Sequence, residues 1–443
     1  MSNASWSDAD ERPSGNPPTV FLHVGTFKSG TSYLQSVLVR NRDRLAEDGV
    51  LFPTGDRKWG AQVRAVRDVL EMKGPTPTEG AWDELVASIH DSPARVAVIS
   101  MEFLSLAKPA TVRKIVDDLR PCQVQVILGA RDLVRVMPSA WQSMVKQGHA
   151  WSIDEFVASV TTNPPESPAE LPADDDVRDQ DAHRRFWHHH DLDKIVEVWG
   201  AGVGEERIHL LTVPPSGAPP TLLWERFCSI LEISPDRYDA SQGKGSNFSL
   251  SFSDTELMRR INVELRPELD RTAFKRWATR FLANHVMRAS QPDQADDDRA
   301  TLSAQTHDWA VARSAEIVEQ IRQRRVQVVG DLAELVPRPL DDPDEERSNE
   351  PKVVYPDGAV RMIVELVKRL AQLDPEAGSS PSRRGGGDGA EERGGQRRAG
   401  RRRAGAGGDS DAAGRARRAR RRAEPQDEPV EGGLDWADEV MYE

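Results

Sequence analysis

The sequence has few cysteines, no long apolar run and no excess of positive charge. Its two cysteines, Cys122 and Cys228, lack metal-ligand spacing, and a disulfide framework would need more of them. No apolar run is long enough to cross a membrane, and the first 18 residues lack the basic start and apolar core of a signal peptide. The 59 Lys and Arg are outnumbered by 72 Asp and Glu, and the net charge of −13 disfavours general nucleic-acid binding. We therefore expect a cytoplasmic protein with reduced thiols.

The apolar segments that are present alternate between strand and helix patterns. Buried strands are expected in the segment that opens at Thr19 and at Arg95–Ser100, Gln123–Gly129 and Arg207–Val213. Helical patterns separate them, one of them running continuously over Ser32–Leu45, and residues 271–335 are also expected to be helical. This alternation predicts an α/β fold: three layers, with a mostly parallel sheet covered by helices on both faces. Ligands of such sheets bind at the carboxyl ends of the strands.

Composition divides the chain into four parts. Residues 1–17 are expected to be a flexible N-terminus, 18–337 the folded domain, and 338–374 a linker with a short amphipathic helix. Residues 375–443 form an Arg/Gly-rich tail with an acidic end, which has too few apolar residues to fold and is expected to be disordered. The arginines of this tail can contact nucleic acid or an anionic surface, but a solvated tail is the favoured interpretation.

The chain after Thr19 combines a strand, a glycine-bounded loop and a helix start. Gly25 and Gly30 have the spacing of the two glycines of a Walker A loop, but Thr31 stands where that motif has its lysine, and Lys28 lies inside the loop. Loop amides and first-turn amides point to one place and have no other partner, so this pattern predicts an anion site. The displaced lysine argues against a nucleoside triphosphate with magnesium.

Two segments resemble a known family. Lys28-Ser29-Gly30-Thr31-Ser32-Tyr33 resembles the phosphosulfate loop of sulfotransferases that use 3′-phosphoadenosine 5′-phosphosulfate (PAPS). Arg131, which leaves a strand, and Ser139, on the next helix, have the spacing of the family segment that binds the 3′-phosphate. The resemblance implies a P-loop NTPase-like sulfotransferase fold that takes PAPS as co-substrate and requires no metal.

The resemblance also implies roles for single residues. Val98–Glu102 resembles the strand end that carries the family's catalytic base, so Glu102 is expected to take the acceptor proton. Lys28 is expected to stabilise negative charge in the transition state. The residues expected to bind the donor are Lys28, Ser29, Gly30, Thr31, Ser32, Tyr33 (near the adenine), Arg131, Ser139, and Lys244 and Gly245 of a glycine-rich segment.

Plainer interpretations remain for each of these features. Glu102 can be a carboxylate at a helix start, and Lys244 can belong to a flexible turn. The long segment 161–181 is either a lid over the acceptor or, as the favoured alternative, a surface insertion. His188-His189-His190 is expected to be a solvated helix start rather than a metal site, because adjacent histidines do not share a helix face.

Taken together, these features predict an enzyme that moves a sulfuryl group from PAPS to a hydroxyl or amine. The expected acceptor is a carbohydrate, a glycolipid or a small molecule. Two alternatives stay open. One is a non-catalytic nucleotide-fold protein that binds partners through its arginine-rich tail, and the other is an ATP-dependent kinase.

Overall fold

The protein is built around a single parallel sheet. The computed structural model describes residues 17–54, 60–72, 77–162, 181–241, 250–290, 298–340 and 349–374. Within these residues six strands pair in the order β2-β3-β1-β4-β5-β6, and every pairing is parallel. The strands are β1 (Thr19–His23), β2 (Val50–Leu51), β3 (Val96–Ser100), β4 (Gln123–Ala130), β5 (Ile208–Thr212) and β6 (Gln327–Val329).

The four strands expected from apolar runs are β1, β3, β4 and β5, which supply the centre of the sheet. Strand β6 was not predicted, and the expectation of continuous helix over residues 271–335 is wrong there. Its three residues are half-buried or exposed, so they carry no apolar signal. They become a strand because the edge of β5 offers backbone partners, with Leu210 opposite Val328.

Helices account for most of the remaining described residues. Those between β1 and β4 are α1 (Thr31–Arg40), α2 (Arg42–Glu47), α3 (Gly60–Val69), α4 (Ala81–His90), the 3₁₀ helix η2 (Glu102–Leu106) and α5 (Pro109–Asp118). Those between β4 and β5 are α6 (Leu133–Lys146), α7 (Ile153–Thr161), α9 (Ala182–His190) and α10 (Leu192–Val203). After β5 come α11 (Leu222–Leu231), α12 (Phe252–Leu265), α13 (Arg271–Phe274), a π-helix (Lys275–Met287), α14 (Arg288–Ser290), α15 (Ala304–Arg322) and α16 (Asp357–Leu373).

The single helix expected over Ser32–Leu45 is in fact two helices. The break falls at Asn41, whose side-chain amide donates to the carbonyl oxygens of Val37 and Asp239. Asn41 therefore ends α1, because its side chain hydrogen-bonds both to the last turn of that helix and to Asp239, almost 200 residues further along the chain. This tertiary contact explains why the local pattern alone did not reveal the break.

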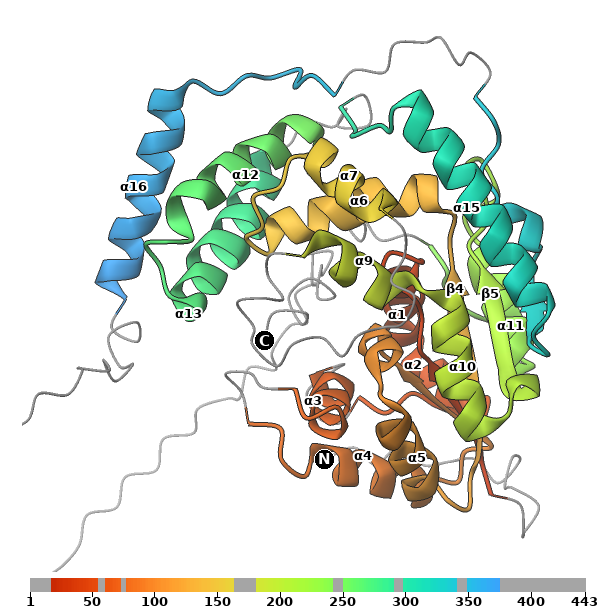
Figure 1. The fold of residues 1–443 in the computed structure, drawn as a ribbon. Coiled ribbons are helices and arrows are strands. Elements are labelled where there is room, and N and C mark those ends of the chain that lie inside the picture. Colours follow the sequence, from red (N-terminus) through yellow and green to blue (C-terminus); the bar gives the residue numbers. More distant parts are fainter. Residues whose placement is uncertain are drawn as a thin grey trace, which may run out of the picture.

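Helices cover both faces of the sheet, as the alternation predicted (Figure 1). Helix α10 packs against β4 and β5 on one face and contacts α5. On the other face lie α1 and α11, where Leu223 of α11 lies against Gly30 and Phe227 contacts His23 edge to face. The result is the expected three-layer α/β architecture.

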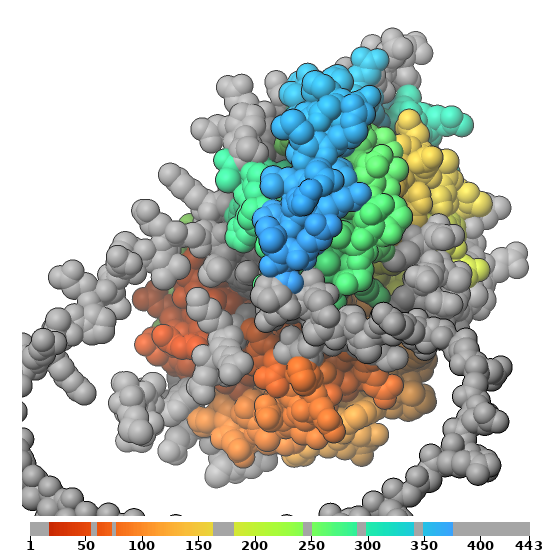
Figure 2. Space-filling view, turned by 90° about the vertical axis from the view of Figure 1, so that its left-hand side faces the viewer, coloured from red at the N-terminus to blue at the C-terminus, as the bar shows by residue number. Residues whose placement is uncertain are grey.

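A group of helices extends beyond the carboxyl edge of the sheet. Helices α6 and α7 lie there together with α12 and α13, and α16 packs along α12 (Figures 1 and 2). Helix α16 buries Val360, Val364 and Val367 in this contact. The segment before α16 is also tied to α12, because Arg260 donates to the Tyr355 carbonyl oxygen and pairs with Asp357.

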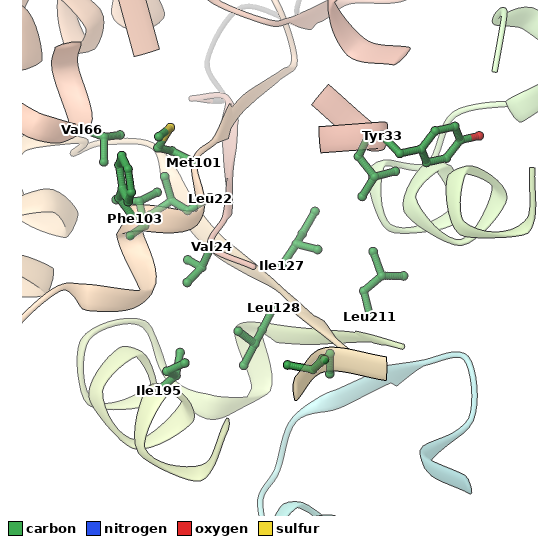
Figure 3. Close-up of a cluster of buried hydrophobic side chains, with 14 of the residues drawn as sticks. Leu22, Val24, Tyr33, Val66, Met101, Phe103, Ile127, Leu128, Ile195 and Leu211 are labelled. Carbon is green, nitrogen blue, oxygen red and sulfur yellow. The ribbon is translucent and has the colours of Figure 1, made fainter. Parts of the chain in front are cut away.

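The core is centred on the sheet. Figure 3 shows part of it: Leu22, Leu128 and Ile195 lie on one side of the sheet, and Ile127 and Leu211 lie on the other. All five side chains are buried, and burial of this kind is the main stabilising term of such a fold. In the described part of the chain, no helix has both the length and the apolar character needed to cross a membrane.

Candidate functional site

Three strand ends meet at the carboxyl edge of the sheet. His23, the last residue of β1, lies opposite Ser100 of β3 and Ile127 of β4. The Lys28 loop follows the first strand, Glu102 the second and Arg131 the third. Parallel pairing therefore brings to one edge the three segments on which the sequence prediction rests.

The loop between β1 and α1 has three residues in the left-handed region. Their φ angles are 51° at Gly25, 64° at Lys28 and 85° at Gly30. A Cβ atom at Gly25 would lie 2.8 Å from the Thr31 hydroxyl, and one at Gly30 would lie 2.6 Å from Leu223 Cδ2. Both glycines are thus required by backbone conformation and by space. Lys28 adopts a conformation that costs a non-glycine residue energy and that is common at functional loops.

Backbone and hydroxyl contacts fix the loop against β4. The amide and the hydroxyl of Thr26 both donate to the Gly129 carbonyl oxygen, at 3.1 and 3.0 Å. The buried Ser29 hydroxyl donates to the Thr26 carbonyl oxygen at 2.6 Å. A Cβ atom at Gly129 would lie 2.6 Å from the Ser29 hydroxyl oxygen, so the close approach depends on this third glycine. The Ser29 side chain therefore serves the loop, and the Ser29 amide also donates to the Thr26 carbonyl oxygen, at 3.4 Å.

The start of α1 has the properties of an anion site. Gly30 is its N-cap, and no side chain among the described residues caps the first turn. The Thr31 hydroxyl is buried and has no hydrogen-bond partner in the described part of the chain. Lys28 is half-buried, and its ammonium pairs with no carboxylate of the described residues. Uncapped amides, an unpartnered hydroxyl and an unpaired ammonium fit a phosphate-like group.

Tyr33 lies apart from these groups. Its ring is buried, and its hydroxyl donates to the Ala240 carbonyl oxygen at 3.0 Å. Burial raises the pKa of this hydroxyl to about 12. Figure 3 shows the hydroxyl pointing away from the core residues around Leu22. Tyr33 thus ties α1 to the segment that ends at Ser241, and its expected contact with an adenine stays a prediction.

Arg131 reaches the loop from β4. Its guanidinium donates to the Lys28 carbonyl oxygen at 3.2 Å, whereas its Nε–H is buried and has no partner among the described residues. Burial is the main reason why its pKa is lowered, to about 10. Arg131 and Thr26 also line a cavity of about 20 Å³ together with Ser314, whose hydroxyl is likewise unpartnered within the described residues. The arginine is therefore a half-buried cation at the loop, and its Nε–H is fully buried.

Ser139 lies two turns into α6. That helix begins at Asp132, whose carboxylate accepts the Arg135 amide at 2.9 Å and pairs with the Arg135 guanidinium. The half-buried Ser139 hydroxyl donates to the Arg135 carbonyl oxygen at 3.0 Å. The Ser139 oxygen accepts no hydrogen bond from the described residues. The hydroxyl must rotate before it can donate to a ligand.

Glu102 opens η2, two residues after β3 ends. Its side chain is buried, with 5% of its surface exposed. The Gln35 side-chain amide donates to Glu102 Oε2 at 3.3 Å. Glu102, the expected base, thus follows β3, the strand that pairs with β1, and the Lys28 loop follows β1. Gln35 was not found from the sequence, because a single glutamine in a helix carries no signal of its own.

The three consecutive histidines were wrongly expected at a solvated helix start. They form the last turn of α9, which packs against the loop. The His189 ring stacks on Phe27 with 4.1 Å between centroids, and His190 Nε2 lies 3.1 Å from the Phe27 carbonyl oxygen. Burial lowers the pKa of His190 to about 4. The tertiary contact with Phe27 overrides the polar character of the segment.

Some predicted features lie outside the described residues. These are Lys244 and Gly245, almost all of segment 161–181, residues 1–16 and the tail from residue 375. The ends of the glycine-rich segment are described. Arg40 of α1 donates to the Ser241 carbonyl oxygen, and Gln142 of α6 donates to that of Leu250. Within the described ranges, no three His, Cys, Asp or Glu side chains are grouped as metal ligands.

The structure is that of an α/β protein with a glycine-bounded loop at the carboxyl edge of a parallel sheet. No protein-family model matches the chain, and no curated protein matches it. Among solved structures it is similar to the crystal structure of a sulfotransferase from Alicyclobacillus acidocaldarius. The identity is 17%, the match covers 58% of this chain and 94% of that one, and the TM-score is 0.34.

Proposed function

We propose that the protein is a sulfotransferase that uses PAPS as sulfuryl donor. The observation that supports this most strongly is the convergence on one loop of Lys28, the uncapped start of α1 and the half-buried Arg131 guanidinium, beside a buried carboxylate at Glu102. A donor with phosphates at both its 3′ and 5′ positions needs two anion sites. This edge of the sheet offers cations from two different strand ends.

Different residues of the site are proposed to bind the 5′-phosphosulfate and the 3′-phosphate of PAPS. The amides of Gly30, Thr31 and Ser32, with the unpartnered Thr31 hydroxyl, are placed to bind the 5′-phosphosulfate. Arg131 is proposed to supply the positive charge for the 3′-phosphate, and Ser139 to add a hydroxyl after rotation. Thr31 stands after Gly30, where a Walker A loop has its lysine. The donor is therefore proposed to bind without magnesium.

Transfer is proposed to take place in one in-line step. The acceptor oxygen or nitrogen forms a bond to sulfur as the bond from sulfur to the bridging phosphate oxygen breaks, and adenosine 3′,5′-bisphosphate leaves. The acceptor proton passes to the Glu102 carboxylate. Lys28 stabilises the negative charge that builds on the bridging oxygen. Burial of Glu102 keeps bulk water from competing with the acceptor for this carboxylate.

The acceptor is proposed to be a hydroxyl or amine of a carbohydrate, glycolipid or small molecule. The test is incubation of the purified protein with PAPS carrying radiolabelled sulfur and, separately, with members of each acceptor class. Label is expected in one class only, and the Glu102→Gln protein should leave that class unlabelled. Magnesium-dependent ATP turnover instead would favour a kinase. If neither donor is consumed or bound, the remaining hypothesis is a protein that binds partners through its tail.

A further inference from the structure

Three buried side chains hold Ser100, the last residue of β3. Its amide donates to Gln62 Oε1 of α3 at 2.8 Å, and its carbonyl oxygen accepts from Gln35 Nε2 of α1 at 3.0 Å. Its hydroxyl lies 2.8 Å from His23 Nδ1 of β1. Gln35, Gln62 and His23 are completely buried. The backbone that leads into Glu102 is therefore fixed by α1, by α3 and by the adjacent strand β1.

Gln35 makes a second contact, with the carboxylate itself. The same Nε2 that donates to Ser100 O lies 3.3 Å from Glu102 Oε2. Both neighbours are acceptors, so the amide orientation is settled: the opposite orientation would bring its oxygen against a carbonyl and a carboxylate. One amide nitrogen thus joins the end of β3 to the proposed base.

Gln35 Oε1 is buried and has no hydrogen-bond partner in the described part of the chain. An unpaired buried oxygen is unfavourable, whereas an apolar side chain would pack beside Leu34 and Leu38 without that cost. Packing does not explain a glutamine at this position. The two contacts of its amide nitrogen do.

We propose that Gln35 is a positioning residue that orients the Glu102 carboxylate for proton transfer. The proposal rests on the proposed function. Gln35 lies one helical turn after the loop, because α1 begins at Thr31. The helix whose first turn binds the donor therefore also holds the base, and one rigid element sets the distance between them. The N–H donor also stabilises the ionised carboxylate, which is the form that accepts a proton.

The test compares Gln35→Met, which keeps the volume and loses the donor, with Ser36→Ala. Ser36 is the next residue of α1, and its hydroxyl bonds only its own helix, at the Tyr33 carbonyl oxygen. Release of adenosine 3′,5′-bisphosphate from PAPS is measured, with water or the identified acceptor. Gln35→Met is expected to lower kcat by about tenfold to a hundredfold, as for a lost hydrogen bond to a charged group. Its KM for the donor and its affinity for the bisphosphate should stay within about twofold of wild type, as should all values for Ser36→Ala.

A double-mutant cycle separates positioning from packing. In a Glu102→Gln background, Gln35→Met should cause no further loss, because the carboxylate it orients is gone. Equal losses in both backgrounds would overturn the proposal. If Glu102→Gln alone is fully active, the proposed base is wrong, which is a failure of the proposed function and not of Gln35 alone.

Crystal structures give a readout that needs no turnover. Wild type and Gln35→Met would each be solved with bound bisphosphate. The Glu102 carboxylate is expected to move away from the end of β3 in the variant, while the Lys28 loop stays in place. An unmoved carboxylate would overturn the proposal whatever the kinetics show.

Discussion

The Arg131 guanidinium donates a hydrogen bond to the carbonyl oxygen of Lys28, at 3.2 Å and across 103 residues of sequence. The contact couples the end of β4 to the loop that follows β1. Arg131 therefore has two tasks in the proposed site: one of its terminal nitrogens supports the loop backbone, and its positive charge attracts the 3′-phosphate. Loss of this side chain should affect both ends of the donor.

The Lys28 ammonium is expected to be essential for turnover. In Lys28→Ala, the charge that stabilises the leaving phosphate oxygen is lost, and turnover should fall by at least about a hundredfold. Release of bisphosphate from PAPS measures it. Lys108→Ala is the matched control, because it removes the same charge from an exposed position before α5. Equal activity of the Lys28→Ala protein and this control would remove Lys28 from the mechanism.

Glu102→Gln should separate binding from transfer. The amide keeps the size of the side chain but cannot accept the acceptor proton, so transfer should fall by about a hundredfold or more. Bisphosphate affinity, measured by calorimetry, should remain within about threefold of wild type, because the contacts proposed for the donor lie on the loop and Arg131. Glu79→Gln, at an exposed position, serves as control. Glu102 is not the base if the variant transfers at the wild-type rate.

Gly129→Ala should displace the Lys28 loop, which packs against Gly129 of β4. The new methyl group would lie 2.6 Å from the Ser29 hydroxyl oxygen and 3.3 Å from its Cβ, so the loop must shift. Overpacking of this kind costs about 1–3 kcal/mol of unfolding free energy, and bisphosphate affinity should fall with it. Gly60→Ala is the control, since its methyl group would meet no atom within 4 Å. Chemical denaturation of both variants tests this, and equal stability would contradict the loop geometry described above.

Stability should decrease in mild acid. Burial lowers the pKa of His23 from 6.5 to about 4, so the unfolded chain takes up this proton first as the pH falls. The contribution of neutral His23 to the free energy of unfolding is complete above pH 6.5. It is lost progressively as the pH falls from 6.5 to about 4. At pH 5 the loss should be about 2 kcal/mol for this group, and His190 should act in the same direction.

Urea unfolding at pH 7 and pH 5 measures this dependence. His23→Gln should reduce the difference between the two pH values, whatever its effect on absolute stability. The exposed His90 gives the control, because His90→Gln should leave the difference unchanged. A His23→Gln protein with the full wild-type difference would show that His23 titrates normally in the fold.

Apolar pattern and glycine spacing made the sheet and the loop predictable. Strands such as β1 and β4 are buried on both faces, so their sequences are continuous apolar runs. The glycines at 25 and 30 were found by their spacing, and both have a positive φ that favours glycine. Local sequence patterns therefore predicted the central strands of the sheet, the alternation of strands and helices along the chain, and the position of the Lys28 loop.

The rest depends on contacts between distant segments. Gln35 and Gln62 are polar residues of the interior that both bond Ser100, and neither shows this in its own helix. The Tyr33 hydroxyl meets Ala240 across 207 residues, which no local pattern indicates. His189 of α9 stacks on Phe27, and His190, which lies 3.1 Å from the Phe27 carbonyl oxygen, is buried. Such polar contacts are specified by tertiary structure, and it is these that complete the candidate site.

The most direct test of the central claim is calorimetric titration with adenosine 3′,5′-bisphosphate, with magnesium and ATP as the competing ligand. The account predicts tight binding of the bisphosphate without metal, weak or no binding of ATP, and loss of bisphosphate binding in Arg131→Ala and in Ser139→Ala. Arg120→Ala, which removes the same charge from an exposed ion pair, should bind as wild type does. Binding of magnesium and ATP but not of the bisphosphate would contradict the account.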